Sequence, residues 1–281
     1  MQLQTLAYAI SGAFTLLSII LSGWLIWTHL LYNPSARIRK HVIRILLMVP
    51  IYALTSYMAL VFNESKLLFE TVRDLYEAFA LYSFHCFLVE YLGGQSVLAS
   101  TMRSKPEMTH VFPFCCVRSW SMGGKFLPHE ELQPMRPWPK FLAIKAIIFF
   151  TYWQSVMISV LVSLGVISEK WHIGCPDCWD AQKIASALND FVICVEMLGF
   201  AIAHHYAFAI EDFLAPAGTS GITVPFSNVK APLLANFMDA INVTDVSTDL
   251  KNSRNEILTK KQALAAKFDR FNTLSPRGSM F

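Results

Sequence analysis

Long runs of hydrophobic residues, broken by short polar segments, are the main pattern along this chain of 281 residues. A helix that rises about 1.5 Å per residue needs ~20 apolar residues to cross a ~30 Å hydrocarbon core. Five runs are long enough: residues 5–31, 42–62, 75–94, 141–167 and 184–210. Because hydrocarbon offers the backbone no hydrogen-bond partners, such runs must be helical. The pattern predicts an all-α, polytopic transmembrane helical bundle with five spans.

Composition supports the same class of protein. Hydrophobic residues make up 54% of the chain and charged residues 15%, far from the average of soluble globular domains. No Lys or Arg precedes the first run, and no charged residue occurs before Asn33, so we expect a retained first span and not a cleaved signal peptide. The net charge of +3 is not clustered on one basic face, which argues against nucleic-acid binding.

The distribution of Lys and Arg predicts the orientation of the bundle. The connections after the first and third runs are rich in cations. The connection after the second run holds Lys66 and Arg73, and the one after the fourth holds Lys170 and Lys183, both mixed with Asp and Glu. By the positive-inside rule, the cation-rich connections face the cytosol. We therefore expect an N-terminus outside, a transmembrane domain over residues 5–210 with a cytosolic loop at 95–140, and a partly disordered cytosolic tail at 211–281.

Polar residues inside the runs are the candidate functional residues. Glu196 lies near the centre of the last run, and Asn189 lies seven residues earlier on nearly the same helical face. Gln154 and His85 fall at a similar depth in the neighbouring runs. An ionisable group in hydrocarbon normally faces the bundle interior or a wet cavity, so these four residues predict a polar belt at the midplane. The alternative is that the polar side chains hydrogen-bond between packed helices.

Two adjacent cysteines suggest attachment to the membrane surface. Cys115 and Cys116 lie among aromatic residues on the predicted cytosolic loop, where S-acylation is a candidate modification. Two free thiols are the other interpretation, and their spacing does not decide between them. An isolated Cys-Cys pair lacks the ligand spacing of structural zinc.

An enzyme is not expected. Histidines and carboxylates in the runs do not converge at one depth, and the chain has no P-loop, glycine-rich dinucleotide motif or Ser/His/Asp signature. We therefore predict no catalytic residues, no metal and no other cofactor.

Several ordered segments together resemble one eukaryotic family. They are Asn33–Ala53, Asp74–Phe79, Leu92–Gly94, Phe112–Cys116, Phe149–Gln154 and Asp190–Met197. The chain resembles the organic solute transporter alpha family, nearest to its transmembrane protein 184 branch, which includes plant LAZARUS-type relatives. The likeness runs from about residue 5 to residue 249.

The resemblance implies seven spans, an outside N-terminus and a cytosolic tail. In transporter members it implies facilitated movement of amphipathic organic solutes such as steroid-derived anions, a single-span beta-type subunit, and a palmitoylated cytosolic loop that corresponds to Cys115 and Cys116. A homo-oligomer is also compatible with it. The chain departs from the family where Phe126–His129 meets Glu131–Pro137, because family members have two further spans between these stretches.

Two hypotheses about function follow. The first is a carrier or carrier-related subunit with Glu196 at a midplane site. The second is a non-transporting membrane scaffold for trafficking or signalling, in which the polar residues serve packing and the acylated cysteines serve localisation; a truncated or splice form fits either.

Overall fold

The computed structural model describes residues 2–94, 136–167, 181–214 and 233–274. Within these ranges every regular element is a helix. The chain divides into two compact units, Met1–Phe237 and Met238–Phe281, which are described separately. The predicted cytosolic loop lies almost entirely outside the described residues, as do Cys115 and Cys116.

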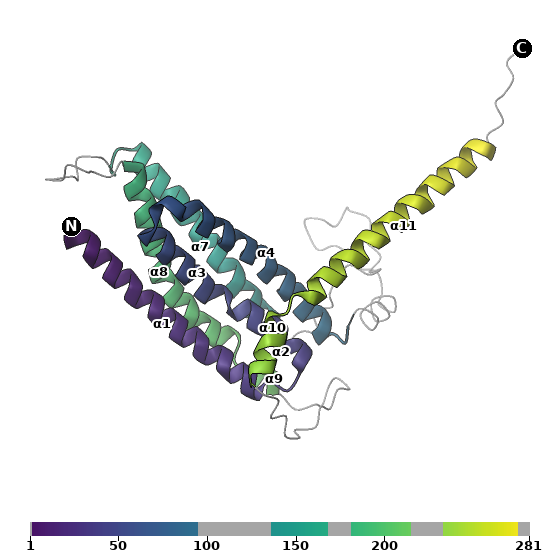
Figure 1. Cartoon of the computed structure of the whole chain (residues 1–281), viewed down its shortest axis with the longest axis horizontal. Coiled ribbons are helices and arrows are strands. Elements are labelled where there is room, and N and C mark those ends of the chain that lie inside the picture. Colours follow the sequence, from purple (N-terminus) through teal and green to yellow (C-terminus); the bar gives the residue numbers. More distant parts are fainter. Residues whose placement is uncertain (1, 95–135, 168–180, 215–232, 275–281) are drawn as a thin grey trace, which may run out of the picture. The chain divides into compact units, whose positions relative to one another are not determined.

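A bundle of long helices forms the first unit (Figure 1). Its elements are α1 (Gln2–Tyr32), α2 (Ala36–Leu46), α3 (Met48–Val61), the 3-10 turn η1 (Asn63–Ser65), α4 (Lys66–Tyr91), α7 (Pro137–Ser163), α8 (Ala181–Ala207) and the short α9 (Glu211–Leu214). Each predicted apolar run falls on one of the long helices, with α2 and α3 sharing the second run. The prediction of an all-α helical bundle is confirmed.

Helix α8 is the centre of this packing. It packs against α1, α3 and α7, while α4 packs against α2 and α3. Ile193, Cys194 and Met197 of α8 are buried, as are Tyr52 and Ala53 of α3. Helix α7 lies at the periphery, because its packing within the described residues is mainly against α8. The core is therefore the α3–α8 contact, with α1 and α4 completing it.

Long-range contacts set the directions of the helices. Nε2 of His29, near the end of α1, lies 2.9 Å from the carbonyl oxygen of Phe208, just after α8. Lys66, at the start of α4, reaches Asp190 in the first half of α8. Lys140, at the start of α7, lies 5.8 Å from the ring of Phe208. Helices α1, α4 and α8 therefore run in one direction and α7 runs in the opposite one.

Within the described residues, four stretches are long and apolar enough to cross a membrane, and α4 is not among them. They are Gln4–Tyr32, Ala36–Val61, Pro137–Ser163 and Ala181–Leu214. Helix α4 covers the predicted third span, 75–94, except its last three residues, and it begins nine residues earlier, at Lys66. The prediction that Lys66 and Arg73 belong to a connecting loop is wrong, because both lie on the helix. Their charge lowers its hydropathy, and contacts inside the bundle hold them there.

A row of small hydroxyl residues lets α1 approach its neighbours closely. The row consists of Ser11, Thr15, Ser18 and Ser22, and all four are buried. Spacings of four, three and four residues place them on one face of α1, the helix that packs against α8 and α3. The Ser18 hydroxyl donates to the carbonyl of Phe14 at 2.8 Å, so it needs no partner on another helix. Small residues at such contacts are typical of packing between membrane helices.

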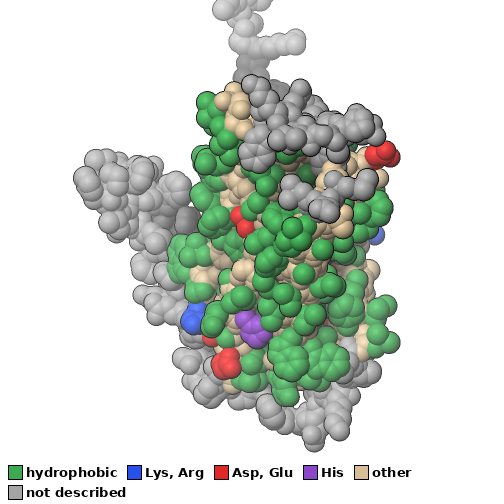
Figure 2. All heavy atoms as spheres, turned by 90° about the vertical axis from the view of Figure 1, so that its left-hand side faces the viewer, with side chains coloured by type: hydrophobic (Ala, Val, Ile, Leu, Met, Phe, Trp, Pro, Cys, Tyr) green, Lys and Arg blue, Asp and Glu red, His purple; other side chains and the backbone are tan. Residues whose placement is uncertain are grey.

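The outer surface of the bundle is apolar. Leu16, Trp24, Phe149 and Tyr152 are each more than half exposed. Figure 2 shows one side of the molecule, on which hydrophobic side chains predominate and charged ones are isolated. A water-soluble protein does not expose so large an apolar surface, whereas lipid tails solvate it well. Contact with a lipid bilayer follows.

The second unit is dominated by α11 (Thr244–Leu274), and α10 (Leu233–Ile241) precedes it. The backbone N–H of Thr244 donates to the side-chain oxygen of Asn242 at 3.1 Å, which satisfies one of the free donors where α11 begins. The described part of the predicted tail is thus mainly helical.

Replacing Ser18 by Leu is expected to lower the free energy of unfolding by ~1–3 kcal/mol, because added methylenes must force two packed helices apart. The measurement is the unfolding free energy in mixed detergent micelles. Gly23→Leu is the matched control, since a side chain at Gly23 meets nothing within 4 Å. An equal loss of unfolding free energy in Ser18→Leu and Gly23→Leu would contradict the close packing of this row.

Candidate functional site

A buried ion pair joins the start of α4 to α8. The Lys66 ammonium lies 2.7 Å from Oδ2 of Asp190 and also donates to the Ser186 carbonyl at 3.2 Å and to the Ser186 hydroxyl. The Asp190 side chain is 1% exposed and that of Lys66 is 16% exposed. The second oxygen of Asp190, Oδ1, is buried and has no hydrogen-bond partner among the described residues. One acceptor of the pair is therefore unused.

Further charges continue along the same face of α4. The charged stripe, as we call it, consists of Lys66, Glu70, Arg73 and Glu77. Glu70 lies 3.6 Å from the Lys66 ammonium. Arg73 donates to the Ser56 hydroxyl at 3.2 Å, and its guanidinium lies 5.8 Å from the ring centre of Tyr52. The Tyr52 hydroxyl donates to Glu77 at 2.9 Å. Signs alternate along the stripe, and its partners come from α3 and α8.

The predicted midplane belt is only partly assembled. The Gln154 amide donates to both the carbonyl and the side-chain oxygen of Asn189, each at 2.9 Å, so these two residues meet between α7 and α8. Glu196 lies two turns further along α8, and its Oε2 is buried without a hydrogen-bond partner among the described residues. His85 is exposed on α4, and no contact with the other three is found. The structure thus brings together two of the four residues.

Sequence reasoning overlooked Asp190. It is the most buried carboxylate that the structure describes within the spans. Its ion pair with Lys66 connects α8 to α4. A signal was present, because an Asp lies six residues before Glu196 in the same apolar run, where ionisable residues are costly. Its partner Lys66 lies outside the predicted apolar runs, so the apolar pattern alone does not indicate the pair.

At the opposite end of the bundle, polar contacts fix the end of α8. His29 of α1 donates to the Phe208 carbonyl, which lies beyond the last turn of α8. The Lys140 ammonium is fully buried and lies 2.5 Å from Oδ2 of Asp212 on α9. The Nε of Arg136 donates to the same Asp212 oxygen at 3.4 Å, and a terminal nitrogen of Arg136 donates to the Tyr206 carbonyl at 3.0 Å. These contacts tie the start of α7 and α9 to the ends of α1 and α8.

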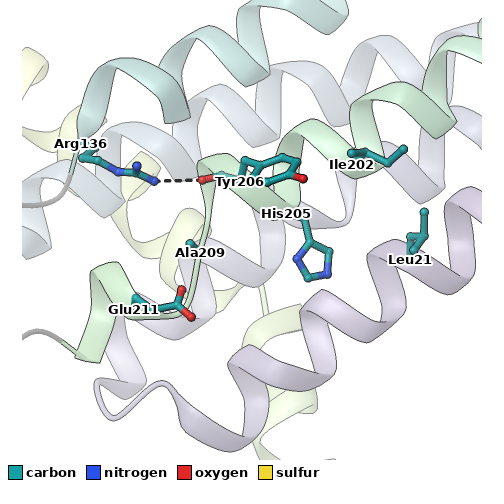
Figure 3. Close-up of a pocket in the computed structure, with 7 residues that line it drawn as sticks. All are labelled: Leu21, Arg136, Ile202, His205, Tyr206, Ala209 and Glu211. Atoms are coloured by element: carbon teal, nitrogen blue, oxygen red, sulfur yellow. Dashed lines mark hydrogen bonds between the residues drawn. The ribbon is translucent and has the colours of Figure 1, made fainter.

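Beside these contacts lies a pocket of about 560 Å³, which we call the end pocket (Figure 3). It is lined by Leu21, Arg136, Ile202, His205, Tyr206, Ala209 and Glu211. Arg136 and Glu211 lie at one end and Leu21 and Ile202 at the other, while His205 points into the space between α8 and α1 (Figure 3). The pocket is therefore polar at one end and apolar at the other.

The two adjacent histidines near the end of α8 have different surroundings. His204 is 2% exposed, and neither of its ring nitrogens has a hydrogen-bond partner within the described ranges. His205 lines the end pocket. Over the described residues, no three His, Cys, Asp or Glu side chains are grouped closely enough to hold a metal ion. Helical geometry sends consecutive side chains in different directions, so the pair does not form one site.

Replacing Lys66 by Met is expected to lower the free energy of unfolding by about 3–5 kcal/mol, because it leaves Asp190 buried without its cation. The double variant Lys66→Met/Asp190→Leu is expected to be more stable than Lys66→Met, since no charge is then stranded. The measurement is the free energy of unfolding of both variants in mixed detergent micelles.

Arg37→Met is the control for this pair. It removes an Arg37–Glu90 contact of 3.8 Å in which the Arg side chain is 80% exposed, and such pairs contribute at most ~1 kcal/mol. A double variant that is no more stable than Lys66→Met would contradict a coupled buried pair.

Comparison with known proteins places the chain in one family. A family model described as organic solute transporter Ostalpha matches residues 7–129 and 126–213. A vacuole membrane protein of Schizosaccharomyces pombe, hfl11, is 28% identical over 310 aligned positions, which cover 86% of this chain and 68% of that protein. No solved structure matches. Since the family model matches well over half of the chain, this multi-pass integral membrane protein belongs to the organic solute transporter Ostalpha family.

Proposed function

We propose that the protein is a carrier, or a carrier-related subunit, for amphipathic organic solutes such as steroid-derived anions. The observation that carries this proposal is the charged stripe of α4, which contacts α3 and, through Lys66, α8 in a bundle whose outer surface is apolar. Burying charges among membrane helices is costly, and such residues normally lie along substrate or ion pathways. Family membership supplies the solute class.

Lys66 and Arg73 provide the anion-attracting groups of this pathway. Each cation is held by an acidic or hydroxyl partner on another helix, at 2.7 Å from Asp190 and 3.2 Å from Ser56. In a low-dielectric interior, a cation that separates from its partner must find another anion. An anionic solute meets this need, and its departure restores the original pair. The exchange couples solute binding to the contact between α4 and α8.

Glu196, Asn189 and Gln154 form the second part of the proposed pathway. Glu196 has a buried oxygen without a partner among the described residues, and the Gln154–Asn189 contact lies two turns earlier along α8. Buried polar groups with unused hydrogen-bonding capacity favour a ligand or water at that level. His85 is exposed on α4 and is not part of the proposed site.

Five crossings are proposed, with α4 as the third. Although α4 is less apolar than the other four, it runs the length of the bundle: Lys66 contacts Asp190 near one end, and the ring of Phe87 lies 6.2 Å from that of Phe213 near the other. Charges that are paired inside the bundle do not have to face lipid. The charge distribution supports an outside N-terminus and a cytosolic tail.

We also propose that the chain lacks two spans that other family members have. The two matches to the family model meet at residues 126–129, where the sequence departs from the family pattern. The alignment with the yeast vacuole membrane protein extends over 310 positions, which is more than the 281 residues of this chain, so part of that relative has no counterpart here. The missing pair would lie directly before α7, which explains why α7 packs mainly against α8.

A single-span beta-type subunit is a proposed partner, and Cys115 and Cys116 are proposed acylation sites. The name of the yeast relative supports a vacuolar or other endomembrane location. The competing function is a membrane scaffold without transport, which is favoured by the extensive direct contacts that the charged stripe makes within the bundle.

Flux of a labelled steroid sulfate into liposomes tests the proposal. The full chain is reconstituted with and without a beta-type subunit, beside a seven-span relative as positive control. Flux above that of empty liposomes is expected. If the relative transports and this chain does not under either condition, the scaffold function replaces the carrier.

Glu196→Gln is expected to lower the flux about tenfold or to alter its pH dependence, as the loss of one ionisable contact predicts. Glu64→Gln is the control, because Glu64 is exposed on η1. Equal flux in the two variants at every pH would remove Glu196 from the pathway.

A further inference from the structure

The end pocket has an arrangement of charge that the proposed solute pathway does not use. Its polar end holds one cation, Arg136, and one carboxylate, Glu211 (Figure 3). Beside them the Lys140 cation is paired with Asp212. The local charges therefore balance. A bare anion gains little from such surroundings, whereas a ligand that carries both a positive and a negative group matches them.

The charged groups retain hydrogen-bonding capacity toward a ligand. Arg136 uses Nε for Asp212 and one terminal nitrogen for the Tyr206 carbonyl, and a guanidinium has five N–H donors. Glu211 and His205 form no hydrogen bond or ion pair with other described residues. A phosphate accepts from the remaining guanidinium donors, and a primary ammonium donates to the carboxylate.

Helix termini favour the same arrangement of charge. Arg136 is the residue before α7, so a negative group beside it lies at the N-terminal end of a helix dipole. The last turn of α8 lines the same pocket through His205 and Tyr206, and there the dipole favours a positive group. The polarity of both helices therefore agrees with a phosphate near Arg136 and an ammonium near Glu211.

The depth of the pocket suits a lipid at the membrane boundary. His29 and Phe208 place the ends of α1 and α8 at one level. Leu21 precedes His29 by eight residues, or about 12 Å along a helix, so the apolar end of the pocket extends from the ends of the helices toward the hydrocarbon. Its volume, about 560 Å³, lies within the usual range for small-ligand sites.

We propose that the end pocket binds the headgroup of a zwitterionic phospholipid with a primary amine, with its phosphate on Arg136, its ammonium on Glu211, and an acyl chain along Leu21 and Ile202. This site is separate from the charged stripe and does not require that the protein transports a solute.

Native mass spectrometry of the full chain in detergent tests the proposal. The protein is titrated with phosphatidylethanolamine, phosphatidylcholine and phosphatidylglycerol that carry identical acyl chains. Phosphatidylethanolamine is expected to bind about tenfold more tightly than phosphatidylglycerol, because only the former supplies an ammonium for Glu211. It is expected to bind more tightly than phosphatidylcholine as well, whose quaternary amine has no N–H. Equal affinity for the three lipids overturns the proposal without any variant.

Three variants locate the binding. Glu211→Gln is expected to abolish the preference for phosphatidylethanolamine over phosphatidylglycerol. Arg136→Gln is expected to lower the affinity for both lipids. Ile202→Trp fills the apolar end of the pocket and is expected to lower the affinity for all three lipids. Arg37→Gln, which removes an exposed cation paired with Glu90, is the matched control and is expected to bind as the wild type does.

Loss of binding in Arg37→Gln equal to that in Arg136→Gln would overturn the site. Displacement of phosphatidylethanolamine by an equal concentration of steroid sulfate would assign the pocket to the solute instead. Because binding is measured without flux, a failure of this proposal is distinguishable from a failure of the transport proposal.

Discussion

The cost of removing charge from water governs the architecture of this protein. Helix α4 carries alternating cations and carboxylates on one face, which lipid would not solvate. Helices α3 and α8 supply the partners, including an Asp190 carboxylate that is almost completely buried. Once α4 is held in this way, its contact with α3 completes one side of the bundle. The apolar contacts of the core and the ionic contacts of α4 thus depend on the same placement of α8.

Two kinds of contact hold α8 at this central position. Toward α1 the contact is close, because small hydroxyl residues allow the backbones to approach, and two of them, Ser11 and Ser18, donate to carbonyls of α1 itself. Toward α4 it is ionic and depends on a few long side chains. The first kind is suited to a permanent scaffold, whereas the second can exchange partners. Helix α8 therefore joins a side of the bundle held by close packing to a side held by ionic contacts.

The two polar regions lie at different levels along α8. The ion pair of Lys66 and Asp190 lies near the start of α8, with an unused acceptor, and the end pocket lies where α8 ends. Each region pairs its cations with carboxylates, Lys66 with Asp190 in the first and Lys140 with Asp212 in the second. Helix α8 therefore connects two separate clusters of paired charge.

The apolar runs alone determined that this protein is a helical membrane bundle, because length and hydropathy are local properties that need no partner. The same local criterion failed at Lys66 and Arg73, since a charged residue is assigned to a loop unless its buried partner is known. Depth placed Gln154 in a belt with Glu196, Asn189 and His85, but Gln154 contacts Asn189 and His85 lies exposed, because depth does not specify which face of a helix turns inward. Only the tertiary structure paired Lys66 with Asp190 and assembled the end pocket, because these contacts connect residues far apart in the chain through the packing of helices.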